Sequence, residues 1–498
     1  MSSLPRTLPR ICVALGLSSA SQLQCAAERE YKDGSTFLEF RLDYLPDPAA
    51  GIEVLRKFRQ SYPDSQILST CRHHSASGHF KGSLEQQVQL LEDALRAGAA
   101  FVDLEVESSE KLKRAVSQLR ELGPVCISYH NFERTPALEP IYRRLRKHSA
   151  DVYKIATTAR KPTDNLRLMD FARAHLDHPV IALGMSEIGV ASRILVSSFG
   201  SLFTYAAPMA EEGTAPGQIP AKMLRGLYRA EKLTKQTRVY GVIASPVSHS
   251  KSPLIHNRAF HARRVDAVYL PFLVPPLQLP DWMKFAAKMP VQGFSVTIPH
   301  KQRIVNHLDI VAPLAKRIGA VNTVWRKAGK WRGTNTDAEG VLKPLARHLR
   351  LARSSILIAG YGGAARAAAI ALGDASARVT VTGRNMKKAQ ALAAAVKGEA
   401  ITLREACERH FDALVHATPL GMTPHTEGCL FDGAIPADLV FDMVYNPRET
   451  LLLKRATEQG LTVVGGIEML LEQAAHQFEI WTGETAPRAV MREALLGT

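Results

Sequence analysis

Apolar and polar residues alternate regularly along the first half of the chain. Short apolar runs, typical of buried strands, are separated by stretches such as 83–97 and 109–122 with apolar residues at i, i+3, i+4 and i+7, which is typical of amphipathic helices. The predicted strands are 11–15, 37–44, 66–72, 101–106, 125–131, 152–159, 180–185 and 202–208. Eight strand–helix units in about 230 residues predict a closed (β/α)8 TIM barrel. An open doubly wound sheet is the alternative, and it is weaker because no glycine-rich phosphate loop follows the first strand.

A second pattern begins near residue 237. Residues 225–236 predict a last barrel helix that runs into a charged linker, and the next apolar run is 239–244. Residues 238–340 mix short strands with polar motifs. From 354 to 466 strands and helices alternate as in a nucleotide-binding α/β domain. The predicted strands of this part are 354–359, 378–382, 413–417, 439–443 and 461–464.

We therefore predict an α/β protein with three domains. The barrel occupies 1–236, a substrate-binding domain occupies 237–345 and is completed by C-terminal helices within 467–498, and a Rossmann-like NADP domain occupies 346–466. The two later domains together form a two-lobed module.

The composition is that of a globular protein, because 46% of the residues are hydrophobic and 22% are charged. Lys and Arg number 63 against 47 Asp and Glu, which gives a net charge of +16. No run of five or six like charges occurs and no basic stretch is interleaved with aromatic residues, so we favour small anionic ligands over nucleic acid. No apolar stretch is long and clean enough to span a bilayer, and the six cysteines form no CxxC pair, so we expect reduced thiols, a cytoplasmic location and no membrane partner. The oligomeric state is not indicated.

Polar residues stand near the ends of the predicted barrel strands, where such barrels carry their active sites. They are Glu39, Arg41, Arg72, His130, Lys154, Arg193 and Gln218. Three arginines around one barrel mouth indicate an anionic ligand, because guanidinium groups bind carboxylates in a bidentate manner.

Lys154 lies among apolar neighbours in DVYKIATTA. Burial disfavours an ammonium ion and leaves an amine that can attack a carbonyl and form a Schiff base. An ion-paired lysine is the alternative. His130, in SYHNF on the neighbouring predicted strand, can supply acid–base chemistry near neutral pH. A lone strand-end histidine is more often structural, but the pairing with a barrel lysine favours a catalytic role.

The segments ICVAL, EFRLDYL, SYHNF, YKIATTA and TAPGQ, in this order over about residues 10–230, resemble type I 3-dehydroquinate dehydratases. The resemblance implies that Lys154 forms an imine with the substrate ketone, that His130 shuttles the proton of the adjacent carbon, and that Arg193 holds the carboxylate. It also implies a ring-binding set with two aromatic walls: Glu39, Arg41, Arg72, Thr214 and Gln218, with Phe132 and Phe199. One position departs from the family, since Ala76 stands where a glutamate usually hydrogen-bonds the catalytic histidine; His74 and His79 are the candidate substitutes.

A glycine-rich loop in ILIAGYGGAARAA follows an apolar strand and opens an alanine-rich helix. Its small residues, which would let the backbone approach a pyrophosphate, are Gly360, Gly362, Gly363 and Ala364. NAD sites usually have Asp or Glu after the second strand of such a unit, whereas this chain has Arg384 and, one turn on, Lys388. These cations favour the 2′-phosphate of NADP.

Residues between 248 and 337 offer substrate chemistry. Hydroxyl groups of SHSKSP suit a carboxylate, and Lys301 of VTIPHK and Asp337 of GTNTD would form an acid–base pair if the fold brings them together. With AVNT, GYGGAARAA, ATPLGM and DMVYNP these motifs resemble shikimate dehydrogenases over nearly all of 238–498. The resemblance implies substrate contacts by Ser250, Ser252, Thr297, Asn322, Tyr445 and Gln473, catalysis by Lys301 and Asp337, and a nicotinamide site formed by Thr418, Met443 and Gly466.

The two resemblances concern consecutive reactions, because the dehydratase product 3-dehydroshikimate is the dehydrogenase substrate. We therefore predict a bifunctional enzyme that uses NADPH, acts on 3-dehydroquinate and 3-dehydroshikimate, and needs no metal. Two alternatives stay open: a shikimate or quinate dehydrogenase with an impaired barrel, and a non-catalytic regulatory protein of quinate metabolism. The presence of Lys154, His130, Lys301 and Asp337 favours the enzyme.

Overall fold

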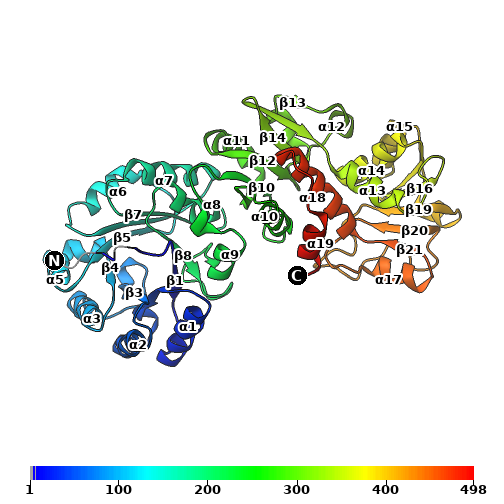
Figure 1. Ribbon diagram of the computed structural model, residues 1–498. Helices are drawn as coiled ribbons and strands as arrows, with labels where there is room; N and C mark the ends of the chain where they lie inside the picture. The colour runs from blue at the N-terminus through cyan, green and yellow to red at the C-terminus, as the bar shows by residue number, and fades with distance from the viewer. Residues whose placement is uncertain (1–3, 6, 498) are drawn as a thin grey trace. The chain divides into compact units, whose positions relative to one another are not determined.

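The computed structural model describes residues 4, 5 and 7–497, and the chain divides into two compact units (Figure 1). The first contains the chain up to Thr237 together with Leu270–Pro290, and the second contains Arg238–Tyr269 and Val291–Thr498. The division into three domains stays a prediction.

The first unit is built on parallel strands in which each strand pairs with the next along the chain and β1 also pairs with β8. The strands are β1 (Ile11–Leu15), β2 (Phe37–Arg41), β3 (Gln66–Thr70), β4 (Phe101–Glu105), β5 (Val125–Asn131), β6 (Val152–Thr158), β7 (Val180–Met185) and β8 (Thr204–Ala207), with a short β9 (Ile219–Pro220) beside β8. Leu202, just before β8, donates its backbone N–H to the Val180 carbonyl of β7 at 2.8 Å. The predicted barrel is confirmed.

Helices cover the outside of this sheet (Figure 1). They are α1 (Ala20–Lys32), α2 (Pro48–Ser61), α3 (Leu84–Arg96), α4 (Val106–Lys111), α5 (Ala115–Leu122), α6 (Leu138–Leu145), α7 (Pro162–Ala174), α8 (Val190–Leu195) and α9 (Ala221–Gly226); α11 (Leu279–Lys288) also belongs to this unit. In α3, Ser83 and Gln86 form a capping box, and Val88, Leu91 and Leu95 are buried.

Two expectations for the helices were wrong. The helix predicted at 225–236 lies earlier, as α9, because Pro220 precedes its first residue and the backbone of Arg229 is left-handed (φ 50°), which no α-helix continues through. The stretch 109–122 is interrupted at Leu112, whose backbone (φ −109°, ψ 83°) is not helical. The buried apolar residues of the predicted stretch lie after the break, as Ala115, Val116 and Leu119 of α5.

A mixed sheet, in the order β11-β10-β12-β14-β15-β13, has most of its strands in the second unit. Its strands are β10 (Arg238–Ala244), β11 (Ala267–Leu273), β12 (Val291–Val296), β13 (Ile310–Val311), β14 (Thr323–Lys327) and β15 (Lys330–Thr334). The helices beside it are α10 (Ser252–Ala262), α12 (Pro313–Ile318), α13 (Asp337–Ala346), α18 (Gly466–Thr482) and α19 (Arg488–Leu496). The C-terminal helices α18 and α19 both pack against α10.

The second sheet of this unit is parallel, in the order β18-β17-β16-β19-β20-β21. Its elements are β16 (Ser355–Ala359), α14 (Gly363–Asp374), β17 (Arg378–Thr382), α15 (Met386–Ala395), β18 (Glu399–Ala400), α16 (Leu403–Cys407), β19 (Phe411–His416), β20 (Ala437–Asp442), α17 (Leu451–Glu458) and β21 (Thr462–Val464). This is the Rossmann strand order: the order in which strands are added to the sheet reverses between β16 and β19, and dinucleotides bind at the carboxyl ends of those strands.

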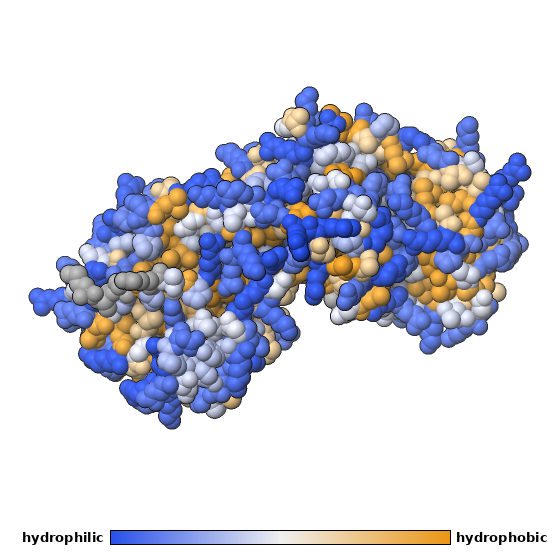
Figure 2. Space-filling model, in the orientation of Figure 1, coloured by the Kyte–Doolittle hydropathy of each residue, from blue (hydrophilic) through white to orange (hydrophobic). Residues whose placement is uncertain are grey.

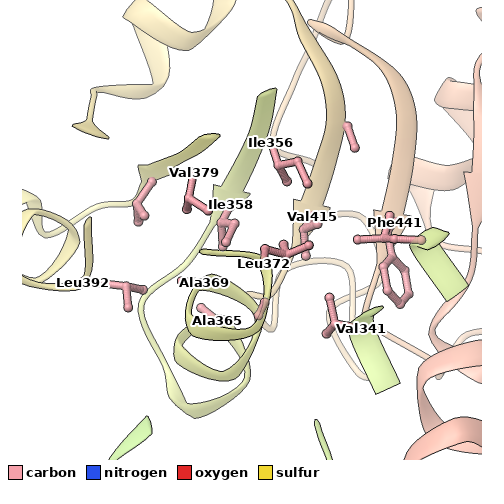
Figure 3. Packing of buried hydrophobic residues seen from close by; sticks show 14 of the residues in the cluster. Val341, Ile356, Ile358, Ala365, Ala369, Leu372, Val379, Leu392, Val415 and Phe441 are labelled. Carbon is pink, nitrogen blue, oxygen red and sulfur yellow. The ribbon is translucent and has the colours of Figure 1, made fainter. Parts of the chain in front are cut away.

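One face of this sheet packs on α14 (Figure 3). Ile356 and Ile358 of β16 and Val415 of β19 meet Ala365, Ala369 and Leu372 of α14 in this core. The small alanine side chains let α14 approach the strands closely. This close packing sets the position of the glycine loop that connects β16 to α14.

Hydrophilic residues cover most of the face seen in Figure 2, with hydrophobic residues between them. Among the described helices, none has both the length and the apolar character that crossing a membrane requires.

Candidate active sites

A cavity opens at the carboxyl ends of the barrel strands. The eight barrel residues predicted for the site all line it: Glu39, Arg41, Arg72, His130, Lys154, Arg193, Thr214 and Gln218. Phe132 lines it as expected, whereas Phe199 does not; the Phe199 ring lies instead below the guanidinium of Arg173 on α7.

Lys154 points into this cavity from β6 and is only 5% exposed. Its Nζ lies 3.1 Å from Oδ2 of Asp103 on β4 and 4.1 Å from the centre of the Tyr205 ring. Burial disfavours ionisation of Asp103, but the charges of Lys154 and Arg72 outweigh it and hold the Asp103 pKa well below its usual range. The lysine is therefore ion-paired, as the alternative interpretation expected, and it also lines the cavity; its role as a Schiff-base lysine stays a prediction.

His130 lies on β5, the strand next to Lys154. In the strand register Ser128 is paired with Lys154 and His130 with Ala156, so His130 is two residues further along. The imidazole is stacked on Phe132, and its Nδ1 is buried without a hydrogen-bond partner among the described residues. Burial, reinforced by the charges of Arg72 and Lys154, holds the His130 pKa well below its ordinary value. The ring is therefore neutral at physiological pH and can accept a proton.

The three arginines of the cavity differ in their partners. Arg41 makes a bidentate ion pair with Asp43, at 2.9 and 2.8 Å, and Arg72 donates to Asp103 at 2.9 Å. Arg193 is 2% exposed, pairs with no carboxylate of the described residues, and donates one bond to the Pro216 carbonyl at 3.1 Å. Burial lowers the pKa of Arg193 to about 10. A buried cation without a counter-charge is costly, so Arg193 is the arginine best suited to an anionic ligand.

Ala76 lies in a short turn of 3₁₀-helix, His74–Ala76, at the rim of the barrel. His74 is exposed and its Nδ1 lies 3.2 Å from the Phe80 carbonyl, whereas His79 lines the cavity and packs edge-on against Tyr44. Of the two histidines considered as substitutes for the missing glutamate, only His79 is at the site.

Lys301 and Asp337 come together in the second unit, 36 residues apart in the chain. Lys301 Nζ lies 2.5 Å from Asp337 Oδ2, and Asn322 Nδ2 donates to Asp337 Oδ1 at 2.7 Å. Asp337 begins α13 and its backbone N–H bonds to Asn335. Both carboxylate oxygens of Asp337 thus have donors, and the lysine amine is held in place beside one of them.

The hydroxyl groups expected to bind a carboxylate lie at the start of α10. Ser252 donates its backbone N–H to Ser250 Oγ at 3.3 Å. Nearby, Tyr269 donates to Ser295 Oγ at 2.7 Å and Ser295 donates to Gln477 Oε1 at 2.9 Å. Thr297 follows β12 and is half-buried.

Gln473 lies on α18. A Cβ atom added to Gly340 of α13 would lie 3.3 Å from the Cβ atom of Gln473, so the two helices are close together at this point. Tyr445 is half-buried just after β20, and burial raises its pKa. Both therefore lie on elements that also carry other predicted site residues, although no direct contact joins them to Lys301 in the described chain.

The glycine loop requires its glycines. Gly360 has φ 124° and a Cβ there would lie 2.8 Å from the Ala417 carbonyl oxygen, while a Cβ on Gly466 would lie 2.6 Å from the carbonyl oxygen of Met443. Gly362 precedes α14, whose first residue is Gly363, and a Cβ on Gly363 would lie 3.8 Å from Lys301 Cδ. Gly363 of the loop and Lys301 are thus neighbours, and Gly466 lies against Met443.

The residues after β17 fit NADP. Arg384 and Lys388 are exposed, and neither is in an ion pair with a described residue. The Lys388 ammonium lies 5.6 Å from the centre of the Tyr361 ring, in the glycine loop. Free backbone at the start of α14 suits a pyrophosphate, and the two cations suit a 2′-phosphate.

Three family models match the chain. The type I 3-dehydroquinase model matches residues 11–235, the shikimate dehydrogenase substrate-binding domain matches 242–324, and the shikimate 5′-dehydrogenase C-terminal domain matches 466–496. The bifunctional 3-dehydroquinate dehydratase/shikimate dehydrogenase of Arabidopsis thaliana, a chloroplastic protein, is 34% identical over 96% of this chain and 83% of its own length. The chain belongs to this bifunctional family.

Relatives of the dehydrogenase half alone are also similar. The NADP(+) shikimate dehydrogenase of Thermosynechococcus vestitus is 40% identical over 54% of this chain and 99% of that protein. Among solved structures, shikimate dehydrogenase from Aquifex aeolicus matches with 36% identity and a TM-score of 0.50, covering 53% of this chain and 99% of its own. A shikimate dehydrogenase in complex with NADP+ matches with 34% identity and a TM-score of 0.50, covering 53% of this chain and 96% of its own. The NADP cofactor predicted from Arg384 agrees with these relatives.

Sequence reasoning missed several residues of the sites. Asp43 and Asp103 orient the barrel cations, and Tyr269 and Gln477 hold Ser295. A signal for Asp103 was present, since FVDLE places an acidic residue inside an otherwise apolar strand. Its partners, Arg72 and Lys154, are 31 and 51 residues away and only the closed barrel brings them together.

Proposed function

We propose that the first unit of this bifunctional enzyme dehydrates 3-dehydroquinate through an imine on Lys154. The amine of Lys154 adds to the ring ketone, and the carbonyl oxygen leaves as water. Neutral His130 then takes a proton from the adjacent carbon, the ring hydroxyl leaves as water with a proton returned by the same histidine, and water hydrolyses the imine to release 3-dehydroshikimate and Lys154. Arg193 binds the carboxylate, and Glu39, Arg41, Arg72, Thr214 and Gln218 hold the ring.

We propose that the second unit reduces 3-dehydroshikimate to shikimate. Bound NADPH supplies the hydride. Lys301 donates a proton to the ketone oxygen as negative charge develops there, and Asp337 holds the lysine in its ammonium form. Ser250 and Ser252 bind the carboxylate, Thr297, Asn322, Tyr445 and Gln473 contact the ring, and Thr418, Met443 and Gly466 shape the nicotinamide site.

The arrangement of Lys154 supports this proposal most strongly. One cavity contains a buried lysine, a neutral histidine on the neighbouring strand and an arginine without a carboxylate partner among the described residues. The direct test is a paired assay on one sample of the purified chain: formation of the conjugated enone from 3-dehydroquinate, followed by NADPH oxidation. A protein that performs neither reaction would favour the regulatory alternative, and one that performs only the second would favour an impaired barrel.

The cofactor preference is expected to depend on Arg384. Arg384→Asp should lower kcat/KM for NADPH by about 10–100-fold, because a charge-assisted contact contributes roughly 1.5–3 kcal/mol. The value for NADH should stay within about threefold. The matched control is Arg378→Asp, at the exposed opposite end of β17. Equal losses with both cofactors, measured as separate kcat/KM values, would contradict the assignment.

The acidic limb of the dehydration pH profile is expected below pH 6.5. His130 must be neutral to accept a proton, and its pKa is depressed, so activity should be retained as pH falls through the ordinary histidine range and be lost only at lower pH. The profile of kcat/KM against pH measures this. His130→Gln should lower kcat by about 10²–10⁴-fold and leave only the limb of the Lys154 amine, and a wild-type midpoint above 6.5 that disappears in His130→Gln would show that the pKa of the imidazole is not depressed.

Small-molecule substrates fit both sites, and we propose neither nucleic acid nor membrane as a partner. A cytoplasmic location stays a prediction, since the relative from Arabidopsis thaliana is chloroplastic.

A further inference from the structure

A buried histidine–aspartate pair connects β19 and β20 at their carboxyl ends. His416 and Asp442 are the last residues of these strands and are paired in register. They are 1% and 0% exposed, and His416 Nδ1 lies 2.9 Å from Asp442 Oδ1. On its other side, His416 Nε2 lies 2.6 Å from the hydroxyl of Thr418.

The hydrogen bonds around Asp442 indicate which atoms of this cluster donate and which accept. Asp442 accepts further bonds from Val444 N at 3.0 Å and Thr450 Oγ1 at 2.5 Å, as an ionised carboxylate does. His416 Nδ1 therefore donates to Asp442, and in a neutral imidazole Nε2 is then an acceptor. With this tautomer the Thr418 hydroxyl donates its only proton to Nε2, and in any tautomer its oxygen accepts the backbone N–H of Leu420 at 3.2 Å.

Thr418 stands next to the glycine loop. A Cβ on Gly360 would lie 3.3 Å from Thr418 Cγ2. The backbone carbonyl of His416 also accepts the N–H of Met443 at 3.0 Å, so one residue supports both Thr418 and Met443. These are two of the three residues proposed to form the nicotinamide site.

We propose that His416, held by Asp442, is a positioning residue of the reductase half. By taking the proton of the Thr418 hydroxyl it leaves an oxygen lone pair of Thr418 as an acceptor for an N–H donor, and the carboxamide of the nicotinamide is that donor. The proposal rests on the proposed function of the second unit. It assigns His416 no part in proton transfer to the substrate.

The test compares two nucleotides on the full chain. His416→Phe keeps a planar ring but removes both nitrogens, and should raise the Kd of NADP+ by about 3–10-fold, the range for one net hydrogen bond. The Kd of 2′,5′-ADP, which lacks the nicotinamide, should not change. Thr418→Val should reproduce the effect, and His416→Phe should add nothing further in a Thr418→Val background. His416→Gln, whose amide can donate to Asp442 and accept from Thr418, should stay within about twofold of wild type.

A matched control lies between the same strands. His410 Nε2 is 2.9 Å from Asp438 Oδ1, but both residues are exposed, so His410→Phe should change neither Kd. Equal weakening of both nucleotides, additive effects of the two substitutions, or wild-type affinity of His416→Phe would each overturn the proposal. If His416→Phe does not fold, as thermal unfolding followed by circular dichroism would reveal, Thr418→Val and His416→Gln still decide. Wild-type protein that neither binds NADP+ nor reduces 3-dehydroshikimate would instead contradict the proposed function.

Discussion

Replacing Lys154 by alanine should lower dehydration of 3-dehydroquinate by more than about 10⁴-fold, because it removes the covalent path and not only one acid–base contribution. NADPH-dependent reduction of 3-dehydroshikimate should stay within about twofold of wild type, since the substitution lies in the barrel unit. That second activity, measured on the same sample, is the internal control for concentration, and circular dichroism with thermal unfolding checks that the barrel unit still folds. Dehydration that survives in the variant would rule out the imine.

Chemical trapping tests the same step without a mutation. Borohydride added with 3-dehydroquinate should reduce the imine and attach mass to the peptide that contains Lys154. Asp103→Asn keeps the shape of the partner but removes its charge, and should lower the yield of trapped product, because the amine then lacks the carboxylate 3.1 Å away that positions it. An unlabelled Lys154 peptide in wild type would count against the mechanism.

Loss of the Lys301 ammonium should have the second largest effect. Lys301→Met should lower kcat for reduction of 3-dehydroshikimate by about 10²–10⁴-fold, the usual contribution of one general acid, with a smaller change in KM. Asp337→Asn should give a loss in the same direction, because it removes the charge 2.5 Å from Nζ. Dehydration should be unchanged in both variants, and steady-state kinetics of each half-reaction measures the split.

The control for this prediction lies on the same helix. Lys343 pairs with Glu339 at 3.3 Å on α13 and is partly exposed, so Lys343→Met should leave kcat within about twofold. A comparable fall in Lys343→Met and Lys301→Met would show that a general change of charge, and not the acid, is responsible. Together, selective losses in Lys154→Ala and Lys301→Met would exclude the non-catalytic regulatory alternative, because each variant keeps one activity.

The sequence determined the strands of the barrel and of the parallel sheet, and it supplied the candidate site residues. Strands such as Ile11–Leu15, Val125–Asn131 and Val180–Met185 were predicted to the residue, because their apolar runs are local and a parallel strand buried on both faces needs little else. The glycine loop, Arg384 and Lys154 were readable for the same reason: each signal lies within a few consecutive residues.

Only the tertiary structure decided which charges are compensated. Three arginines looked alike in the sequence, yet Arg41 and Arg72 have carboxylate partners, and Arg193 has none in the described part of the chain. The sequence likewise left His74 and His79 equivalent, and only the path of the chain after β3 brings His79 into the cavity. Asp103 and Lys154 are 51 residues apart in the chain, and Asp442 and His416 are 26 apart. Each pair comes within hydrogen-bond distance only when the sheets form. Burial and ion pairing depend on such distant partners, so no local pattern contains them.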